Sequence, residues 1–159
     1  MTTTPSTIRN YKQVTEIFRE ISLSQDSVKQ FQVGEISDLD MQNQQHEFVR
    51  FPLVFMVPRP STMDRFGKMI LGFSFVVSDI VKNNDEYLTI DTQNNCLMIM
   101  QDIMSKFIMT DWATVPLKIQ TPITMIPFME RFNNNLAGWS AEINVEVQNP
   151  FDLCNAAFN

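Results

Sequence analysis

The amino-acid sequence predicts an α+β fold, in which an antiparallel β-sheet with a long C-terminal hairpin is covered by two helices. Two segments, Ile8–Leu23 and Asp85–Ile108, repeat apolar residues at helical spacing. Apolar runs rich in β-branched and aromatic residues lie between and after them, and the last third alternates apolar and polar side chains. Because the connections within the strand segments are short, we expect antiparallel pairing with both helices on one face.

The chain of 159 residues is expected to form a single domain over residues 1–159, with a loose N-terminus at residues 1–7. Hydrophobic residues make up 44% and charged residues 19%, which is typical of a chain that buries a core. The eleven methionines either fill irregular gaps in that core or pack against other subunits. The sequence leaves both interpretations open.

The net charge of −6 argues against specific nucleic-acid binding, because the basic residues are scattered rather than clustered. An acidic surface is still compatible with a channel through which DNA slides. The longest apolar run, Met69–Val77, is too short to cross a membrane. Two cysteines, Cys96 and Cys154, do not form a secreted disulfide framework, and we expect an intracellular protein with reduced thiols.

The first helix is amphipathic and is followed by two predicted strands, Phe31–Ile36 and Phe48–Val57. Pro52 places the second strand, which is expected to be buried, near a sheet edge or a bulge. The apolar stripe of this helix consists of Tyr11, Val14, Ile17, Phe18 and Ile21.

A loop is predicted over Pro58–Lys68, and it is longer than a tight hairpin needs. It is either a plain connection or an arm that contacts another molecule. The side chains suited to contact are Arg59, Met63, Arg65 and Phe66. The next predicted strand, Met69–Val81, places Leu71, Phe73, Phe75 and Val77 on one face.

The second helix and the final hairpin complete the chain, with a further short strand expected near Val115–Ile119. The helix stripe consists of Leu88, Cys96, Ile99, Met100, Ile103, Met104 and Phe107. The hairpin spans Pro122–Cys154 and turns at residues 133–135. On its second strand Trp139, Ala141, Ile143, Val145 and Val147 share the dry face. Gly138 is expected to permit a tight entry into this strand, and Trp139 to anchor the hairpin in the core or to meet a neighbouring subunit.

No catalytic or metal-binding pattern is present in the sequence. His46 is the only histidine, the serines lack a G-x-S-x-G elbow, and the cysteines do not form a C-x-x-C pair. The carboxylate pairs Asp38–Asp40 and Asp85–Glu86 are in positions that favour turns and helix starts. We therefore expect a protein that is not an enzyme and has no cofactor and no metal.

Glu142 and Glu146 stand on the wet face of the last strand, four residues apart. They are either ordinary solvated side chains, a DNA-averse channel lining, or one half of an intersubunit row of ion pairs.

Several motifs resemble those of the head–tail connector and tail-completion (tail-terminator-like) virion proteins of tailed phages, of the kind found in Bacteroidetes-infecting and marine phages. The motifs are Pro127-Phe128-x-Glu130-Arg131-Phe132, Leu136-Ala137-Gly138-Trp139 and Val147-x-Asn149-Pro150-Phe151-Asp152-x-Cys154. The helix with Asp91-Thr92-Gln93 and Met100-Gln101-Asp102-Ile103, and the strand Phe73–Val81 with its Ser78-Asp79, are also similar.

The resemblance implies a structural protein of the phage neck or tail, located in the virion and, during assembly, in the host cytoplasm. Such proteins form homo-oligomeric rings that contact portal, neck or tail proteins and leave a channel for DNA, which is not bound specifically. The candidate subunit-interface or channel-facing residues are Arg59, Met63, Arg65, Phe66, Glu142 and Glu146. The alternatives are a small intracellular protein-binding or assembly-chaperone module and, less favoured, a hydrolase without a standard motif.

Overall fold

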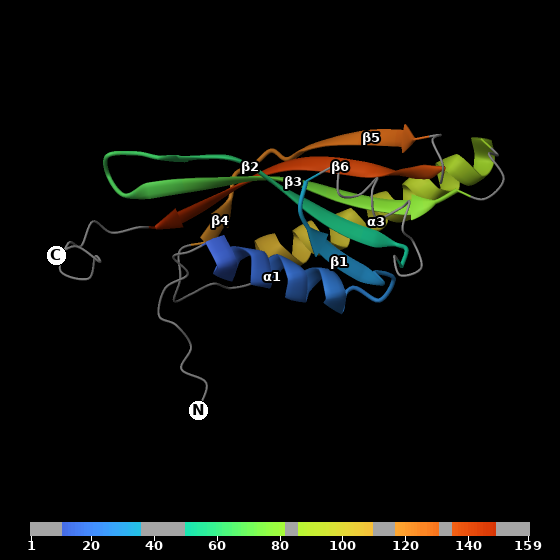
Figure 1. The fold of residues 1–159 in the computed structure, drawn as a ribbon, viewed down its shortest axis with the longest axis horizontal. Helices are drawn as coiled ribbons and strands as arrows, with labels where there is room; N and C mark the ends of the chain where they lie inside the picture. The colour runs from blue at the N-terminus through green and yellow to red at the C-terminus, as the bar shows by residue number, and fades with distance from the viewer. Residues whose placement is uncertain (1–10, 36–49, 82–85, 110–116, 131–134, 149–159) are drawn as a thin grey trace, which may run out of the picture.

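A computed structural model describes residues 11–35, 50–81, 86–109, 117–130 and 135–148 of the chain. These residues form two helices and six strands (Figure 1). The helices are α1 (Tyr11–Ser24) and α3 (Glu86–Met109). The strands are β1 (Gln30–Val33), β2 (Leu53–Met63), β3 (Lys68–Ile80), β4 (Leu117–Ile119), β5 (Thr124–Glu130) and β6 (Leu136–Gln148).

All six strands belong to one sheet, whose order is β1-β2-β3-β6-β4, with β5 also paired to β6. Every pair is antiparallel except β1 with β2, which are parallel. The predicted α+β class is therefore confirmed, although the sheet is mixed rather than wholly antiparallel. The connection from β1 to β2 spans residues 34–52, and parallel neighbours need a connection of about a dozen residues or more.

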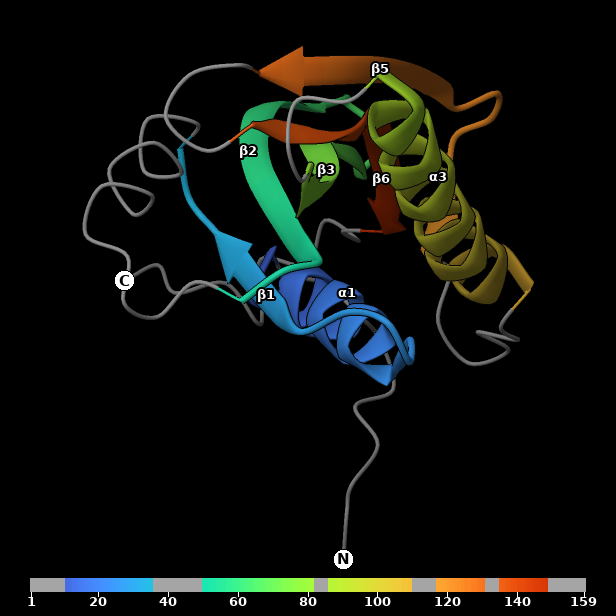
Figure 2. The same cartoon turned by 90° about the vertical axis from the view of Figure 1, so that its right-hand side faces the viewer.

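Both helices lie against the same face of the sheet, and the main core fills the space between them (Figure 2). Phe18 of α1 occupies the centre of this core. Its ring stacks on that of Phe107 of α3 with centroids 4.5 Å apart, and it packs 5.6 Å from Phe75 of β3. Aromatic pairs at these separations stabilise a core beyond the area that they bury. The prediction that two helices cover the sheet is confirmed.

The helix stripes match the predicted ones except at their N-terminal ends. Val14, Phe18 and Ile21 are buried as predicted, but Tyr11 is exposed. In α3 the stripe from Cys96 to Phe107 is buried, whereas Leu88 is 38% exposed. The ring of Tyr11 still lies 5.5 Å from that of Phe73, so this side chain borders the core without being covered by it. Helical spacing predicts which side of a helix a residue is on, but not how completely it is covered there. Residues 8–10 and Asp85 lie outside the described residues.

The first part of β2 is apolar on both faces. Val54 and Met56 point to the helices, while Leu53 and Phe55 form a second, smaller cluster on the opposite face with partly buried Phe51, Val57 and Val76. A strand that is covered on both sides has a continuous apolar sequence instead of an alternating one. This explains the uninterrupted run that begins near Phe51.

The predicted loop over Pro58–Lys68 is wrong, because β2 continues to Met63 and β3 begins at Lys68. The carbonyl of Met56 accepts a hydrogen bond from the Gly34 N–H at 3.2 Å, so the backbone groups of Met56 are directed toward the β1 edge of β2. The nitrogen of Pro58, two residues further along the extended chain, is directed toward the same edge. Among the described strands only β1 pairs along that edge, and it ends before it reaches Pro58. A proline is tolerated there because its missing N–H is not needed for the sheet.

A bulge interrupts the pairing of β2 with β3 between Arg59 and Thr62. Gly72 of β3 lies opposite, where an added Cβ would be 2.7 Å from the Pro60 carbonyl oxygen. The Gly72 N–H donates to Ser61 Oγ at 3.3 Å. A glycine is therefore required for the close approach of the two strands at this bulge.

The alternation predicted for the last strand is confirmed in β6. Ala141, Ile143, Val145 and Val147 are buried under the helices, and Glu142 is exposed on the opposite face. Gly138 differs from its predicted role, because it lies within β6 rather than at its entry. A Cβ on Gly138 would stand 1.9 Å from the carbonyl oxygen of Val77, so this position requires glycine for close strand packing.

Candidate interaction surface

The distal parts of β2 and β3 form an arm that projects beyond the helices (Figure 1). We define the arm as residues 59–72, since Arg59 pairs with Gly72 and the chain reverses between Met63 and Lys68. Two exposed apolar side chains lie at its tip: Met63 is 58% exposed and Phe66 is 82% exposed. Aromatic residues, methionine and arginine are enriched where proteins contact one another.

One carboxylate holds the turn at the tip. Asp64 Oδ1 accepts hydrogen bonds from the N–H groups of Phe66 at 2.8 Å and Lys68 at 3.0 Å. The Asp64 N–H donates to the Lys68 carbonyl at 2.9 Å, and Gly67 has a φ of 88°, which only glycine adopts without strain. The tip therefore has a fixed conformation before it meets a partner, and this lowers the entropic cost of binding.

The tip presents a cation and an aromatic ring together. The guanidinium of Arg65 lies 5.6 Å from the centre of the Phe66 ring, within the range of a cation–π interaction. Within the described part of the chain, no carboxylate pairs with Arg65. Arg65 and Phe66 thus form an exposed unit with an unneutralised positive charge.

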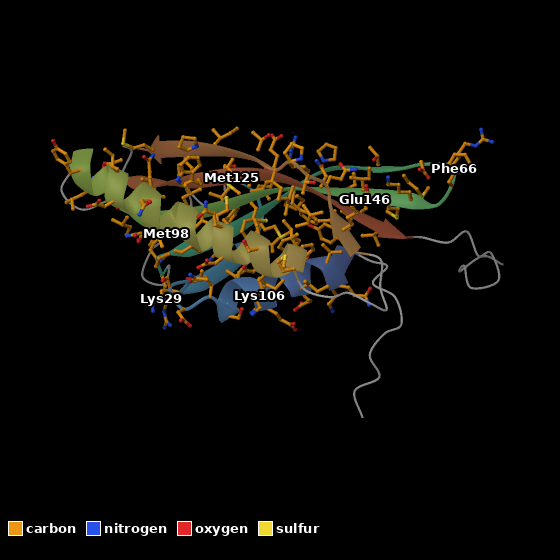
Figure 3. The ribbon with its side chains drawn as sticks, turned by 180° about the vertical axis from the view of Figure 1, so that it is seen from behind. Lys29, Phe66, Met98, Lys106, Met125 and Glu146 are labelled. Carbon is orange, nitrogen blue, oxygen red and sulfur yellow. The ribbon has the colours of Figure 1, made fainter. Side chains whose placement is uncertain are left out.

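Two ion pairs join the arm to β6 on the sheet face that the helices leave open, one at the base of the arm and one next to its tip turn. Arg59 Nη1 is 3.2 Å from Glu142 Oε2, and Lys68 Nζ is 3.2 Å from Glu146 Oε1. Arg59 reaches β6 across β3 at Gly72, which has no side chain to block it. Glu146 lies opposite Ile70 of the arm, and Figure 3 shows Phe66 at the arm's end.

The environment of Glu146 favours its charged form. The largest effect is a hydrogen bond from Gln120 Nε2 to Glu146 Oε1 at 3.1 Å, and the contact with Lys68 adds to it. Together with the charge of Lys118, these interactions lower the pKa of Glu146 below its ordinary value. Glu142 and Glu146 are thus paired within the chain, and this face is charge-balanced rather than simply acidic.

The six candidate residues named from the sequence divide into two groups in the structure. Met63, Arg65 and Phe66 lie at the tip of the arm, whereas Arg59, Glu142 and Glu146 take part in the ion pairs that join the arm to β6. Sequence reasoning placed Arg59 in a loop with the tip residues and did not predict its pairing with Glu142. The signal for that pairing was Gly72, whose role is visible only once the strand register is known.

Trp139 joins β6 to α3. Its ring is half-buried and packs against the main core, and Nε1–H donates to the Gln93 carbonyl at 2.9 Å. The Gln93 side chain in turn donates from Nε2 to the Phe128 carbonyl of β5 at 3.1 Å. Gln93 therefore fixes α3 to both strands of the C-terminal hairpin, to β6 through its backbone carbonyl and to β5 through its side chain.

A polar hollow of about 260 Å³ lies between the end of α1 and the last turns of α3. It is lined by Ile21, Ser24, Gln25, Asp26, Asp102, Ile103 and Lys106. Gln25 Nε2 donates to Asp102 Oδ2 at 3.2 Å, and Lys106 Nζ donates to Ser24 Oγ at 2.8 Å. Sequence reasoning did not predict this hollow, because its two sides lie far apart along the chain and carry no shared motif.

No protein-family model matches the chain, and no curated protein matches it. The resemblance to phage connector and tail-completion proteins therefore stays a prediction.

The described residues contain no group of three or more histidine, cysteine, aspartate or glutamate side chains able to hold a metal ion. Neither of the two described helices is long and apolar enough to cross a membrane. His46, Asp38, Asp40 and Cys154, considered in the sequence, lie outside the described residues.

Proposed function

We propose that this chain is a structural virion protein of a phage neck or tail, and that copies of it assemble into a ring which joins head and tail components around the DNA channel. The observation that carries the proposal is the arm. It places a rigid, exposed Arg65–Phe66 unit at one end of the molecule, away from the core that its own chain provides (Figure 3).

The arm is suited to assembly because its stability does not depend on a partner. Its strands are the extensions of β2 and β3, and two ion pairs hold it to β6, one at its base and one next to its tip turn. Its tip therefore keeps one conformation in the free chain. Contacts between different surfaces of identical copies close into a ring when the rotation between them closes.

A second candidate function is that of a small intracellular protein-binding or assembly-chaperone module. The observation that favours it is the exposed face of α3, where Tyr87, Met98 and Met109 are accessible. Flexible methionine side chains suit surfaces that adapt to several partners. In this case the chain would bind another protein through α3 without forming a ring.

Sedimentation velocity of the purified chain over a range of concentrations tests the proposed function. We expect a closed oligomer in the parent chain and a shift toward monomer in Phe66→Ser. The matched control is Tyr87→Ser, which removes an aromatic side chain of similar exposure (79%) from the start of α3. Under the chaperone alternative, Tyr87→Ser is expected to weaken the binding of a partner protein, and Phe66→Ser is expected to leave it unchanged.

Rings of this kind can require a partner, so portal and neck proteins are added in a second series. A chain that stays monomeric at every concentration, and that binds none of these proteins, would contradict the ring. Negative-stain images of the assembled fraction then give its shape directly.

A further inference from the structure

We propose that the Arg65–Phe66 tip of one copy docks into the hollow between α1 and α3 of the next copy. This inference rests on the proposed function, and it names the acceptor surface that a ring requires. It commits to a second copy of this chain as the occupant.

Opposite charges on the two surfaces favour this contact. The hollow carries two carboxylates, Asp26 and Asp102, and one ammonium, Lys106. Lys106 is held by Ser24 Oγ, and Asp26 forms no ion pair or hydrogen bond within the described residues. The tip brings the guanidinium of Arg65, which has no ion pair among the described residues, and arginine binds carboxylates with two parallel hydrogen bonds.

The hollow also suits the tip in its size and in its mixture of polar and apolar side chains. The hollow has a volume of about 260 Å³, and Ile21 and Ile103 are the apolar residues of its lining. This volume is large enough for a phenyl ring and a guanidinium together. Phe66 is the most exposed large apolar side chain among those described, and it projects from a turn fixed by Asp64. A rigid aromatic side chain entering a pocket beside an arginine is the usual composition of an interface hot spot.

The tip and the hollow of one copy lie apart from each other. Figure 3 shows Phe66 at one end of the long axis and Lys106, which lines the hollow, well away from it. The tip of a copy therefore does not reach its own hollow. The two surfaces are different and lie on different parts of the chain, so their contact is head-to-tail and repeats from copy to copy.

A charge-reversal series tests the contact. Arg65→Glu and Asp26→Arg each place like charges together, and each is expected to weaken association about tenfold or more. The double variant Arg65→Glu/Asp26→Arg restores opposite charges and is expected to recover association. Glu20→Arg is the control, because it makes the same charge change on the exposed side of α1. Thermal melting checks that each variant folds, since all three side chains are exposed.

The double variant decides between the docking and a general charge effect. If Asp26→Arg assembles like the parent chain, or if the double variant associates no better than the single ones, the docking is wrong.

Cross-linking separates this inference from the proposed function. In a Cys154→Ser background, a mixture of Phe66→Cys chains and Asp26→Cys chains is treated with a short bis-maleimide reagent. We expect a mixed dimer in this mixture and none when Thr124→Cys, on β5, replaces Asp26→Cys. A ring that forms without the mixed dimer would overturn the docking and leave the ring. If the parent chain does not assemble and the cysteine variants do not cross-link, both the docking and the proposed ring are wrong.

Discussion

At the scale of single residues, the closest backbone approach in the sheet occurs at Gly138. Its hydrogen atom faces the Val77 carbonyl, and a Cβ there would lie 1.9 Å from that oxygen. Only a displacement of β3 or β6 makes room for a methyl group, and the pairing of these two strands is the longest in the sheet.

Gly138→Ala is therefore expected to destabilise the chain by about 1–3 kcal/mol, the usual cost of overpacking a close-packed site. The measurement is the free energy of unfolding in urea. Ser140→Ala, two residues along the same face of β6, is the control and is expected to change stability little. Equal stability of Gly138→Ala and the parent chain would show that the strands separate at no cost.

Trp139 contributes through two separable interactions. Trp139→Phe keeps most of the ring and removes the hydrogen bond to the Gln93 carbonyl, so we expect a loss of about 0.5–1.5 kcal/mol. Trp139→Ala also removes the packing against the core and is expected to cost about 3 kcal/mol, the lower end of the range for buried aromatic residues, because this ring is half-buried. Unfolding free energies of both variants measure the two parts. A Trp139→Ala chain that melts like the parent would remove its role as an anchor.

At the scale of elements, those with a strong period were predicted well. The alternation of β6 and the stripe of α3 from Cys96 to Phe107 both match the buried residues of the structure. Their patterns are set by one covered face, which the sequence records directly.

The arm could not be predicted in the same way. Pro58 and Pro60 mark a loop in most contexts, and they are tolerated here because β1 ends before this part of β2. That reason depends on the strand order, which no local pattern contains. The hollow was missed for a similar cause, since Asp26 and Asp102 come together only through the packing of α1 on α3.

The hydrogen bond from Gln120 and the ion pair with Lys68 make the contribution of Glu146 to stability depend on pH. The folded chain lowers the pKa of Glu146, so this carboxylate contributes stability above the pKa of an unfolded glutamate, about 4.3. That contribution is lost as the pH falls through the lower folded-state value.

Unfolding in urea at a series of pH values, for the parent chain and Glu146→Gln, measures this dependence. The stability difference between the two chains is expected to be largest above about pH 5 and to vanish in acid. Lys68→Gln removes one of the two partners and is expected to reduce the same pH dependence in part, because the hydrogen bond from Gln120 remains. A difference that stays constant over the whole range would mean that the carboxylate is not stabilised by these contacts.

At the scale of the whole molecule, the residues that form the core and the residues available to contact other molecules lie in different regions. The helices and the covered face of the sheet form the main core, while the arm carries exposed apolar side chains away from it. Substitutions at the tip should therefore change association without changing stability, and substitutions in the core should do the reverse. This separation is what allows the assembly experiments above to be interpreted.

The charge balance of the open sheet face leads to a prediction about DNA. The chain has a net charge of −6, and Glu142 and Glu146 neutralise Arg59 and Lys68 on this face. If the face lines the channel of the proposed ring, the parent chain is expected not to retard duplex DNA in a gel at about 0.1 M salt, because phosphate binding needs free cations.

Glu142→Gln/Glu146→Gln frees both cations, and we expect weak, salt-sensitive retardation of DNA by the assembled fraction. Glu16→Gln/Glu20→Gln makes the same change in net charge on α1, and it is expected to leave DNA mobility unchanged. Retardation by both double variants would indicate that net charge alone governs the effect. Retardation by neither would place this face away from the DNA, and the arm would then be the part of the proposal that remains.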